Sequence, residues 1–261
     1  MLARIRSIAF GTVIGALLVV APATAQSDEE PLARFEDPIC VGVAGLRQEP
    51  AEAMVGRIRA NAEALGRRLA PAGDCVPNLI VAFIRDPQEF LASLQEGNGW
   101  VFAEMRREDR ETLLNESGPV RALLRVRART RDGLPIPRRE NMVDIPQTEM
   151  WMAHSKIYSA TRNDIINAMI LFDRDEIAGM TVDQMADYAT FRALTRTLPE
   201  TAETRRDSIL ALFDGGAARP AALTEFDRAY LGELYSGMAN LPASARLAEL
   251  EKATGRDIFM Q

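Results

Sequence analysis

The sequence predicts an α+β fold, in which a mixed β-sheet with an N-terminal βαβ unit precedes a helical C-terminal third. Two observations support this prediction. In the first part of the chain, short apolar runs alternate with segments whose apolar residues recur at helical spacing, as in strands that alternate with helices. From Thr181 onward, helix-start signals and helical spacing replace the strand-like runs. The apolar fraction of 47% is enough for an ordinary core.

The first 25 residues are typical of a secretory signal peptide. Arg4 and Arg6 precede an apolar run over residues 8–20, and the small-residue motif A-T-A at 23–25 follows it. The apolar run is shorter than the roughly 20 residues that span a bilayer, so a permanent anchor is less favoured. We therefore expect a periplasmic or secreted protein, with no stable membrane insertion after cleavage.

The domain organisation follows from these boundaries. Residues 1–25 form the signal peptide, and the polar residues 26–37 are expected to form a loose leader. Residues 38–261 are expected to form a single α+β domain, whose helical part covers 181–261. No internal repeat or low-complexity tract indicates a further division.

The charge of the chain argues against nucleic acid as a partner. Cleavage after residue 25 removes two arginines and no acid, which takes the formal net charge from −6 to −8. Binding to nucleic acid or to anionic membranes depends on clustered positive charge. Only Lys156 and Lys252 are lysines, so arginine is the general cation of this chain. An arginine cluster is therefore a weaker indication of function here than usual.

The two cysteines predict a disulfide. Export places Cys40 and Cys75 in an oxidising compartment, where pairing is the default. A zinc site lacks ligands, because His154 is the sole histidine and two cysteines do not complete a tetrahedral site. A nucleophilic pair of cysteine and His154 conflicts with the disulfide. We accordingly expect no metal and no cofactor.

Residues 39–84 predict the βαβ unit. The apolar run 39–43 predicts a strand, and the stretch NLIVAFI at 78–84 predicts a second, buried strand parallel to it. Between them, apolar residues recur at helical spacing after Pro50, at positions 54, 58, 65 and 69. The disulfide would tie the first strand to the loop before the second.

The next segment predicts two helices and an arginine-bearing strand. An N-cap signal at 86–89 begins a helix to about residue 95, and a second helix covers 107–115. Residues 120–128 then alternate between apolar side chains at even positions and arginines at 121, 125, 127 and 129, which predicts a half-buried strand. We interpret the arginines as a solvated face paired with acids on neighbouring strands, in preference to an anion-binding ladder.

Two further strands are expected at 150–158 and 165–172, joined by a turn at SATRND (159–164). The proline-rich residues 131–147 predict a long loop. His154 lies on the first of these strands, where no motif ties it to a nucleophile or an acid.

The C-terminal third predicts several helices. Thr181 and Gln184 form a capping box for a helix that continues to about Leu198, before Pro199. Shorter helices are expected at 207–213, 224–235 and 242–253.

This order of elements resembles that of exported, uncharacterised proteobacterial proteins with a zincin-like metallopeptidase fold. The stretches that carry the resemblance are FEDPICVGV, NLIVAFI, INAMILFD, ALTRTLP with DSILALFD, and LTEFDRAYLGELY. They are scattered over most of the mature chain. The resemblance implies a βαβ unit and further strands that lead into a long helix with the metal motif.

The resemblance places RALTR, residues 192–196, where the metal motif H-E-x-x-H would stand. Two histidines at i and i+4 bind zinc in that motif, and the glutamate activates the bound water. Arg192 and Arg196 would replace both ligands, and Ala193 would replace the base. A guanidinium offers no lone pair to a metal. The resemblance thus implies a zincin-like shell without the activity.

Two interpretations of the arginine pair stay open. Arg192 and Arg196 are favoured as a solvated helix face, with Asp187 or Glu200 as partners in exposed ion pairs. Alternatively, they line the former cleft and bind a carboxylate or phosphate.

Two functions follow for the whole chain. The favoured function is a non-catalytic binding or scaffold module of the cell envelope, whose partner is an unknown protein or small molecule. The alternative is a periplasmic hydrolase in which His154 acts with nearby acids, for which Asp144 and Glu149 are candidates. The sequence contains no phosphate-binding glycine loop, no G-x-S-x-G, no S-x-x-K and no EF-hand pattern.

Overall fold

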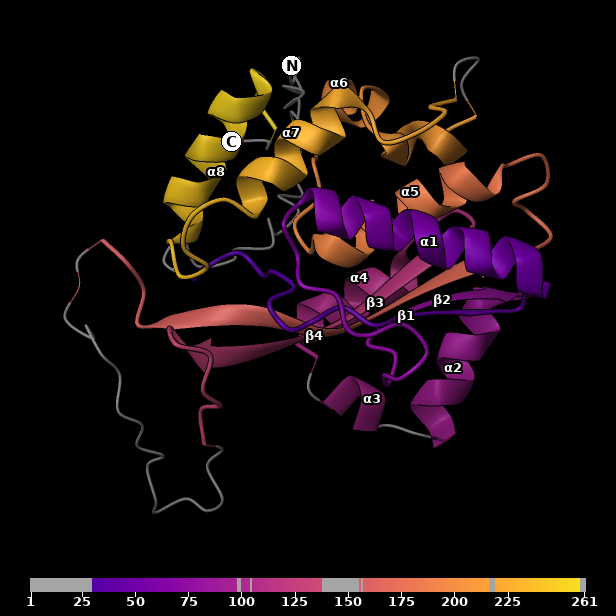
Figure 1. Cartoon of the computed structure of the whole chain (residues 1–261), viewed down its shortest axis with the longest axis horizontal. Coiled ribbons are helices and arrows are strands. Elements are labelled where there is room, and N and C mark those ends of the chain that lie inside the picture. Colours follow the sequence, from indigo (N-terminus) through magenta and orange to yellow (C-terminus); the bar gives the residue numbers. More distant parts are fainter. Residues whose placement is uncertain are drawn as a thin grey trace, which may run out of the picture.

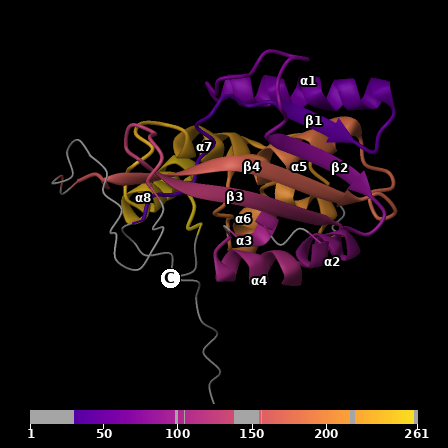
Figure 2. The same ribbon diagram turned by 90° about the horizontal axis from the view of Figure 1, so that it is seen from below.

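The computed structural model describes residues 30–97, 100–103, 105–137, 155, 157–215 and 219–258. Four strands form one mixed sheet in the order β1-β2-β4-β3. These are β1 (Val41–Ala44), β2 (Leu79–Ile84), β3 (Val120–Thr130) and β4 (Thr161–Asp173). β1, β2 and β4 run parallel, whereas β3 pairs antiparallel with β4 at the edge (Figure 2). The predicted α+β class and the mixed sheet are confirmed.

Helices cover both faces of the sheet. α1 (Gln48–Ala64) joins β1 to β2 and lies with α5 (Val182–Leu194) above the sheet in Figure 1. α2 (Pro87–Gly97) and α3 (Trp100–Ala103) lie below it, and α4 (Arg107–Asn115) precedes β3. Alternate residues of the strands therefore point into two apolar clusters. The smaller cluster contains Leu91, Phe102, Leu113, Leu123 and Leu171.

The main core lies between the sheet and the helices α1 and α5. Met54 and Ile58 of α1 are fully buried there, as the helical spacing predicted. Phe83 of β2 and Phe172 of β4 stack with their ring centroids 5.1 Å apart. The rings of Phe191 on α5 and Tyr230 pack with their centroids 5.6 Å apart, and this contact joins the main core to the C-terminal helices.

The C-terminal third is helical, as predicted. It contains α6 (Ala202–Arg206), the 3-10 helix η1 (Ile209–Phe213), α7 (Glu225–Leu234) and α8 (Ala243–Thr254). The capping box at Thr181 and Gln184 begins α5, and a second one, formed by Thr224 and Asp227, begins α7. The sequence did not predict α6. Residues 209–213, expected to be part of an α-helix, form a 3-10 helix instead.

The disulfide is present between Cys40 and Cys75, with the two Cα atoms 6.1 Å apart. Cys40 directly precedes β1, and Cys75 lies in the loop that leads to β2. The disulfide therefore joins the starts of two neighbouring parallel strands. Among the helices in the described ranges, none is both long and apolar enough to cross a membrane.

The prediction of a turn at SATRND is wrong. Thr161, Arg162, Asn163 and Asp164 form the first part of β4, which pairs with β3 as far as Thr130. The two strands form one long arm that extends to the left in Figure 1. Of the strand expected at 150–158, the described residues at 157–158 form a bend, and most of the rest lies outside the described residues. Polar residues suggested a turn, but in β4 their polar groups have partners within the fold.

The prediction of a loose leader is wrong for residues 31–37. Leu32, Ala33 and Phe35 are buried in the main core, with Phe35 fully inaccessible. The backbone of Arg34 pairs with β4, since its N–H donates to the Asn163 carbonyl at 3.1 Å. The polar side chains of this segment misled the prediction, because the guanidinium of Arg34 is itself satisfied by carbonyl groups after α7.

One phenol holds this segment against the rest of the molecule. The Tyr235 hydroxyl accepts from the Phe35 N–H at 2.9 Å and donates to the Leu194 carbonyl at 2.7 Å. The N-terminal segment, the end of α5 and the end of α7 therefore meet at a single side chain.

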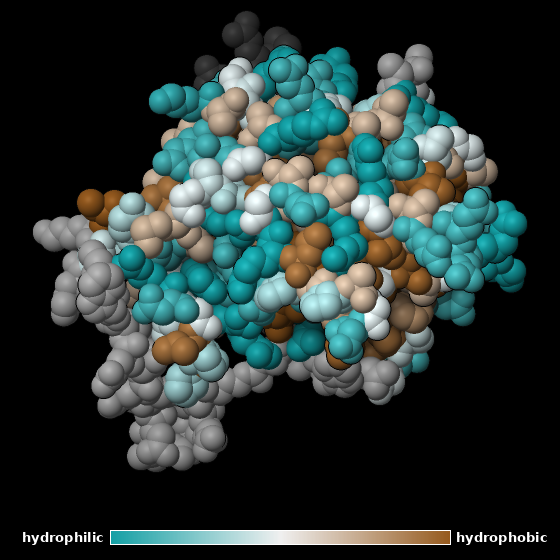
Figure 3. Space-filling view, in the orientation of Figure 1, coloured by the Kyte–Doolittle hydropathy of each residue, from teal (hydrophilic) through white to brown (hydrophobic). Residues whose placement is uncertain are grey.

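The molecular face in Figure 3 is hydrophilic over most of its area, with smaller hydrophobic patches.

Candidate functional site

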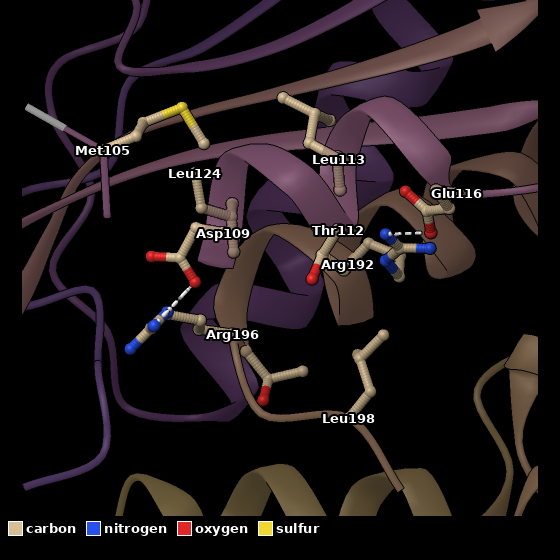
Figure 4. Close-up of a pocket in the computed structure, with 11 residues that line it drawn as sticks. Met105, Asp109, Thr112, Leu113, Glu116, Leu124, Arg192, Arg196 and Leu198 are labelled. Atoms are coloured by element: carbon tan, nitrogen blue, oxygen red, sulfur yellow. Dashed lines mark hydrogen bonds and ion pairs between the residues drawn. The ribbon is translucent and has the colours of Figure 1, made fainter. Parts of the chain in front are cut away.

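Two neighbouring cavities lie where the end of α5 approaches α4 and the start of β3. The smaller cavity has a volume of about 100 Å³, and the larger one about 520 Å³. Thr112 and Glu116, from α4 and the residue after it, line both cavities, as does Arg192 of α5. The ion pair of Arg192 with Glu116 therefore forms part of the wall between them (Figure 4).

Arg192 is a buried residue of the last turn of α5, with 7% of its surface exposed. One guanidinium nitrogen lies 2.6 Å from Glu116 Oε1, and another donates to the Tyr188 hydroxyl at 3.3 Å. The interpretation of Arg192 as part of a solvated helix face is therefore wrong. Its closeness to Tyr188 follows from helical spacing, since the two residues are four apart on α5.

Arg196 lies beyond the end of α5, so the two arginines do not share one helix face. The helix ends at Leu194, and Thr195 has extended backbone angles. The Thr195 hydroxyl donates to the Thr197 carbonyl at 2.7 Å, which stabilises the non-helical turn before Pro199. The prediction of a helix to Leu198 is wrong for this reason.

The partners of the arginines also differ from the prediction. Arg196 donates through Nε and Nη2 to Asp109 Oδ1, at 3.0 and 2.6 Å (Figure 4). Asp109 and Glu116 both belong to the α4 segment, so this segment supplies both carboxylates. The predicted partners, Asp187 and Glu200, are not those of the two arginines. Asp187 instead forms an ion pair with Arg57.

Tyr188 and Glu116 stabilise the buried positive charge of Arg192. Burial by itself would lower the pKa of the Arg192 guanidinium, but the adjacent Tyr188 and Glu116 raise that pKa above its ordinary value. A buried cation without such a partner is strongly destabilising. The carboxylate of Glu116 therefore occupies the place that an anionic ligand of Arg192 would take.

The larger cavity holds a second, more exposed ion pair. Arg205 of α6 lies 3.2 Å from Asp214, and the two side chains are 42% and 43% exposed. The cavity wall also carries polar residues from the α4–β3 connection and apolar residues from η1. Its other lining residues include Asn115, Ser117, Val120, Tyr188, Leu210 and Phe213. The wall thus combines two cations, two carboxylates, hydroxyl and amide groups, and an apolar side.

The structure does not describe the candidate catalytic residues of the hydrolase alternative. His154, Asp144 and Glu149 all lie outside the described residues. The alternative stays a prediction, and His154→Ala is the variant that tests it once an activity is found. Within the described ranges, no group of three or more His, Cys, Asp or Glu residues is placed to hold a metal ion.

Comparison of the chain with protein-family models, with curated proteins and with solved structures found no match.

Sequence reasoning found both arginines of RALTR but missed most of the residues that surround them. Tyr188 had a signal, because it stands four residues before Arg192 on a predicted helix. Asp109 and Glu116 had none, because they approach the end of α5 from about 80 residues away in the chain. Arg205 and Asp214 were equally hidden, since their meeting depends on how α6 and η1 pack.

Proposed function

We propose that the protein is a non-catalytic binding module, exported to the periplasm or the medium, that takes a small polar ligand in the larger cavity. The observation that carries the proposal is the cavity itself, which has a volume of about 520 Å³ and is lined by Arg192. Cavities of roughly 300–1,000 Å³ with a few directed polar groups are typical of small-molecule sites. Export is supported by the signal-like N-terminus and by the disulfide between Cys40 and Cys75.

The zincin-like resemblance enters as part of the same proposal. It is supported by the chain order, in which a βαβ unit and two further strands precede α5. Under this proposal, Arg192 and Arg196 stand at the sequence positions of the two metal ligands, but only Arg192 lies on the helix. Both are cations already engaged with carboxylates, so the site is suited to binding a ligand and not to holding zinc.

A cavity-blocking variant tests the proposal. Thr112 is an exposed residue of α4 that lines both cavities, so we expect the indole of Thr112→Trp to obstruct them. Glu111→Trp places the same side chain one residue away on α4, outside the cavity walls, and is the matched control. Thermal unfolding of both variants checks that the fold is retained.

The measurement is native mass spectrometry of the disulfide-bonded protein with a panel of amino acids, dicarboxylates, sugar phosphates and peptides. We expect at least one panel member to bind the wild type and Glu111→Trp but not Thr112→Trp. The proposal fails if no member binds, or if a bound member is retained equally by Thr112→Trp. Capture of a protein partner that ignores the Thr112→Trp change would favour a scaffold function instead.

A further inference from the structure

The charged groups of the larger cavity indicate which class of ligand it takes. The wall contains two arginines, Arg192 and Arg205, and two carboxylates, Glu116 and Asp214. Each arginine is paired with one carboxylate across the wall, at 2.6 Å for Arg192 with Glu116 and at 3.2 Å for Arg205 with Asp214. The lining therefore has no excess of either sign.

A balanced lining disfavours ligands of a single charge. A ligand that carries only anionic groups would be attracted by the two arginines, but Glu116 and Asp214 of the same wall would repel it. A purely cationic ligand would face the two arginines. A ligand that carries one ammonium and one carboxylate can replace both halves of an existing ion pair, so no charge in the wall is left without a partner.

The two ion pairs differ in how easily a ligand can open them. Arg192 and Glu116 have side-chain exposures of 9% and 20%, so separating them leaves a largely buried cation. Arg205 and Asp214 are 42% and 43% exposed, and exposed pairs of this kind contribute little to stability. The entering ligand is therefore expected to open the Arg205–Asp214 pair and to leave the Arg192–Glu116 pair in place.

We propose that the larger cavity binds a small zwitterion of the amino-acid type, with its carboxylate on Arg205 and its ammonium on Asp214. The Arg192–Glu116 pair and the Tyr188 hydroxyl then form a polar wall behind the ligand. Leu210 and Phe213 of η1 supply apolar surface for a side chain. This inference rests on the proposed function, because it assigns a ligand class to the same cavity.

Charge-deleted analogues test the ligand class directly. Free L-amino acids with side chains of different size are titrated into the disulfide-bonded protein by calorimetry, followed by the N-acetyl and the amide derivatives of the tightest binder. We expect each derivative to bind the wild type at least about tenfold more weakly, since each loses one charge-assisted contact. Equal affinity for the N-acetyl derivative would overturn the assignment of a zwitterion.

Variants of the exposed pair then assign each charge to a residue. In Asp214→Asn, we expect the amino acid to bind about tenfold more weakly and the N-acetyl derivative to suffer no further loss. In Arg205→Gln, the amide derivative should suffer no further loss in the same way. Arg107→Gln removes an exposed arginine of α4 outside both cavities and is expected to bind as the wild type does.

The outcomes separate this inference from the proposed function. If simple anions bind and Thr112→Trp abolishes their binding, the cavity is a binding site but the zwitterion assignment is wrong. If amino acids bind equally to the wild type, Asp214→Asn and Arg205→Gln, the residue assignment is wrong. If nothing in the panel binds, both the function and the inference fail.

Discussion

Asp187 of α5 is fully buried and accepts hydrogen bonds from three residues in two other parts of the molecule. Arg57 donates to both of its oxygens, at 2.8 and 2.7 Å, and Asn61 donates at 2.7 Å from the same helix, α1. The Leu223 N–H donates at 2.7 Å from the segment before α7. Burial would raise the pKa of Asp187, but these donors outweigh it and hold the pKa below its ordinary value. A buried carboxylate with this many donors is stabilising only while it is ionised.

The sign of this pKa shift predicts how Asp187→Asn behaves with pH. A lowered folded-state pKa contributes stability above the unfolded value of about 4, and that stability is lost as the pH falls through the folded value. We expect Asp187→Asn to lower the free energy of unfolding by about 2 kcal/mol at pH 7, from loss of charge-assisted hydrogen bonds. The difference from the wild type should shrink at acidic pH, below the ordinary pKa of an aspartate.

Urea unfolding of both proteins at pH 7 and near pH 3 measures this difference. Asp183→Asn, in the exposed first turn of the same helix, is the matched control, with an expected loss below about 1 kcal/mol. A loss for Asp187→Asn that is the same at both pH values would contradict the assigned role of the ionised carboxylate.

At the residue scale, the sequence drew attention to Arg192 and Arg196 but not to Arg205, and it did not indicate how any of the three is held. The i, i+4 spacing of Arg192 and Arg196 is visible in the sequence, yet Arg192 is buried and Arg196 lies past the helix end. The environment of each arginine depends on α4, whose approach is a matter of tertiary packing. Local spacing cannot report a contact that closes over about 80 residues.

At the scale of elements, strong local signals were reliable and weak ones were not. The βαβ unit, β3, the capping box of α5 and the helix α7 formed as expected, because apolar periodicity and N-cap chemistry are local properties. β4 is longer than predicted, since Thr161, Asn163 and Asp164 favour turns by composition but find partners in the sheet and the N-terminal segment. Tertiary context overrode propensity there.

The N-terminal segment at 31–37 gives a prediction at this scale. Phe35 is fully buried in the main core, so we expect Phe35→Ala to lower the free energy of unfolding by about 3–5 kcal/mol. Phe90→Ala, at a half-buried position on α2, removes the same atoms and should cost clearly less. Thermal and urea unfolding compare the two variants. Equal losses would mean that the segment does not contribute to the core as its burial indicates.

At the scale of the whole molecule, the disulfide is the covalent link between segments far apart in sequence. It joins residues 35 positions apart, at the starts of β1 and β2. Closing a loop of this length stabilises a fold by about 4 kcal/mol in the chain-entropy model. We expect the double variant Cys40→Ser, Cys75→Ser to lose stability on this scale, measured by urea unfolding against the oxidised wild type.

Reduction of the wild type with dithiothreitol provides the matched measurement, because it opens the same loop without a change of sequence. Reduced wild type and the double variant should unfold at similar urea concentrations. If the oxidised and reduced wild type were equally stable, the disulfide would not be a stabilising element of this fold.

The meeting of three segments at Tyr235 has a consequence for the order in which the native structure is completed. The segment at 31–37 is synthesised before every strand of the sheet. Its backbone, however, forms hydrogen bonds with the backbone of Asn163 and Ile165 and with the hydroxyl group of Tyr235. The growing chain offers the strand partners only after residue 165 has been made, and the phenol only after Tyr235. The first part of the domain to leave the ribosome is therefore among the last to reach its final contacts, and these contacts are the non-local kind that form slowly.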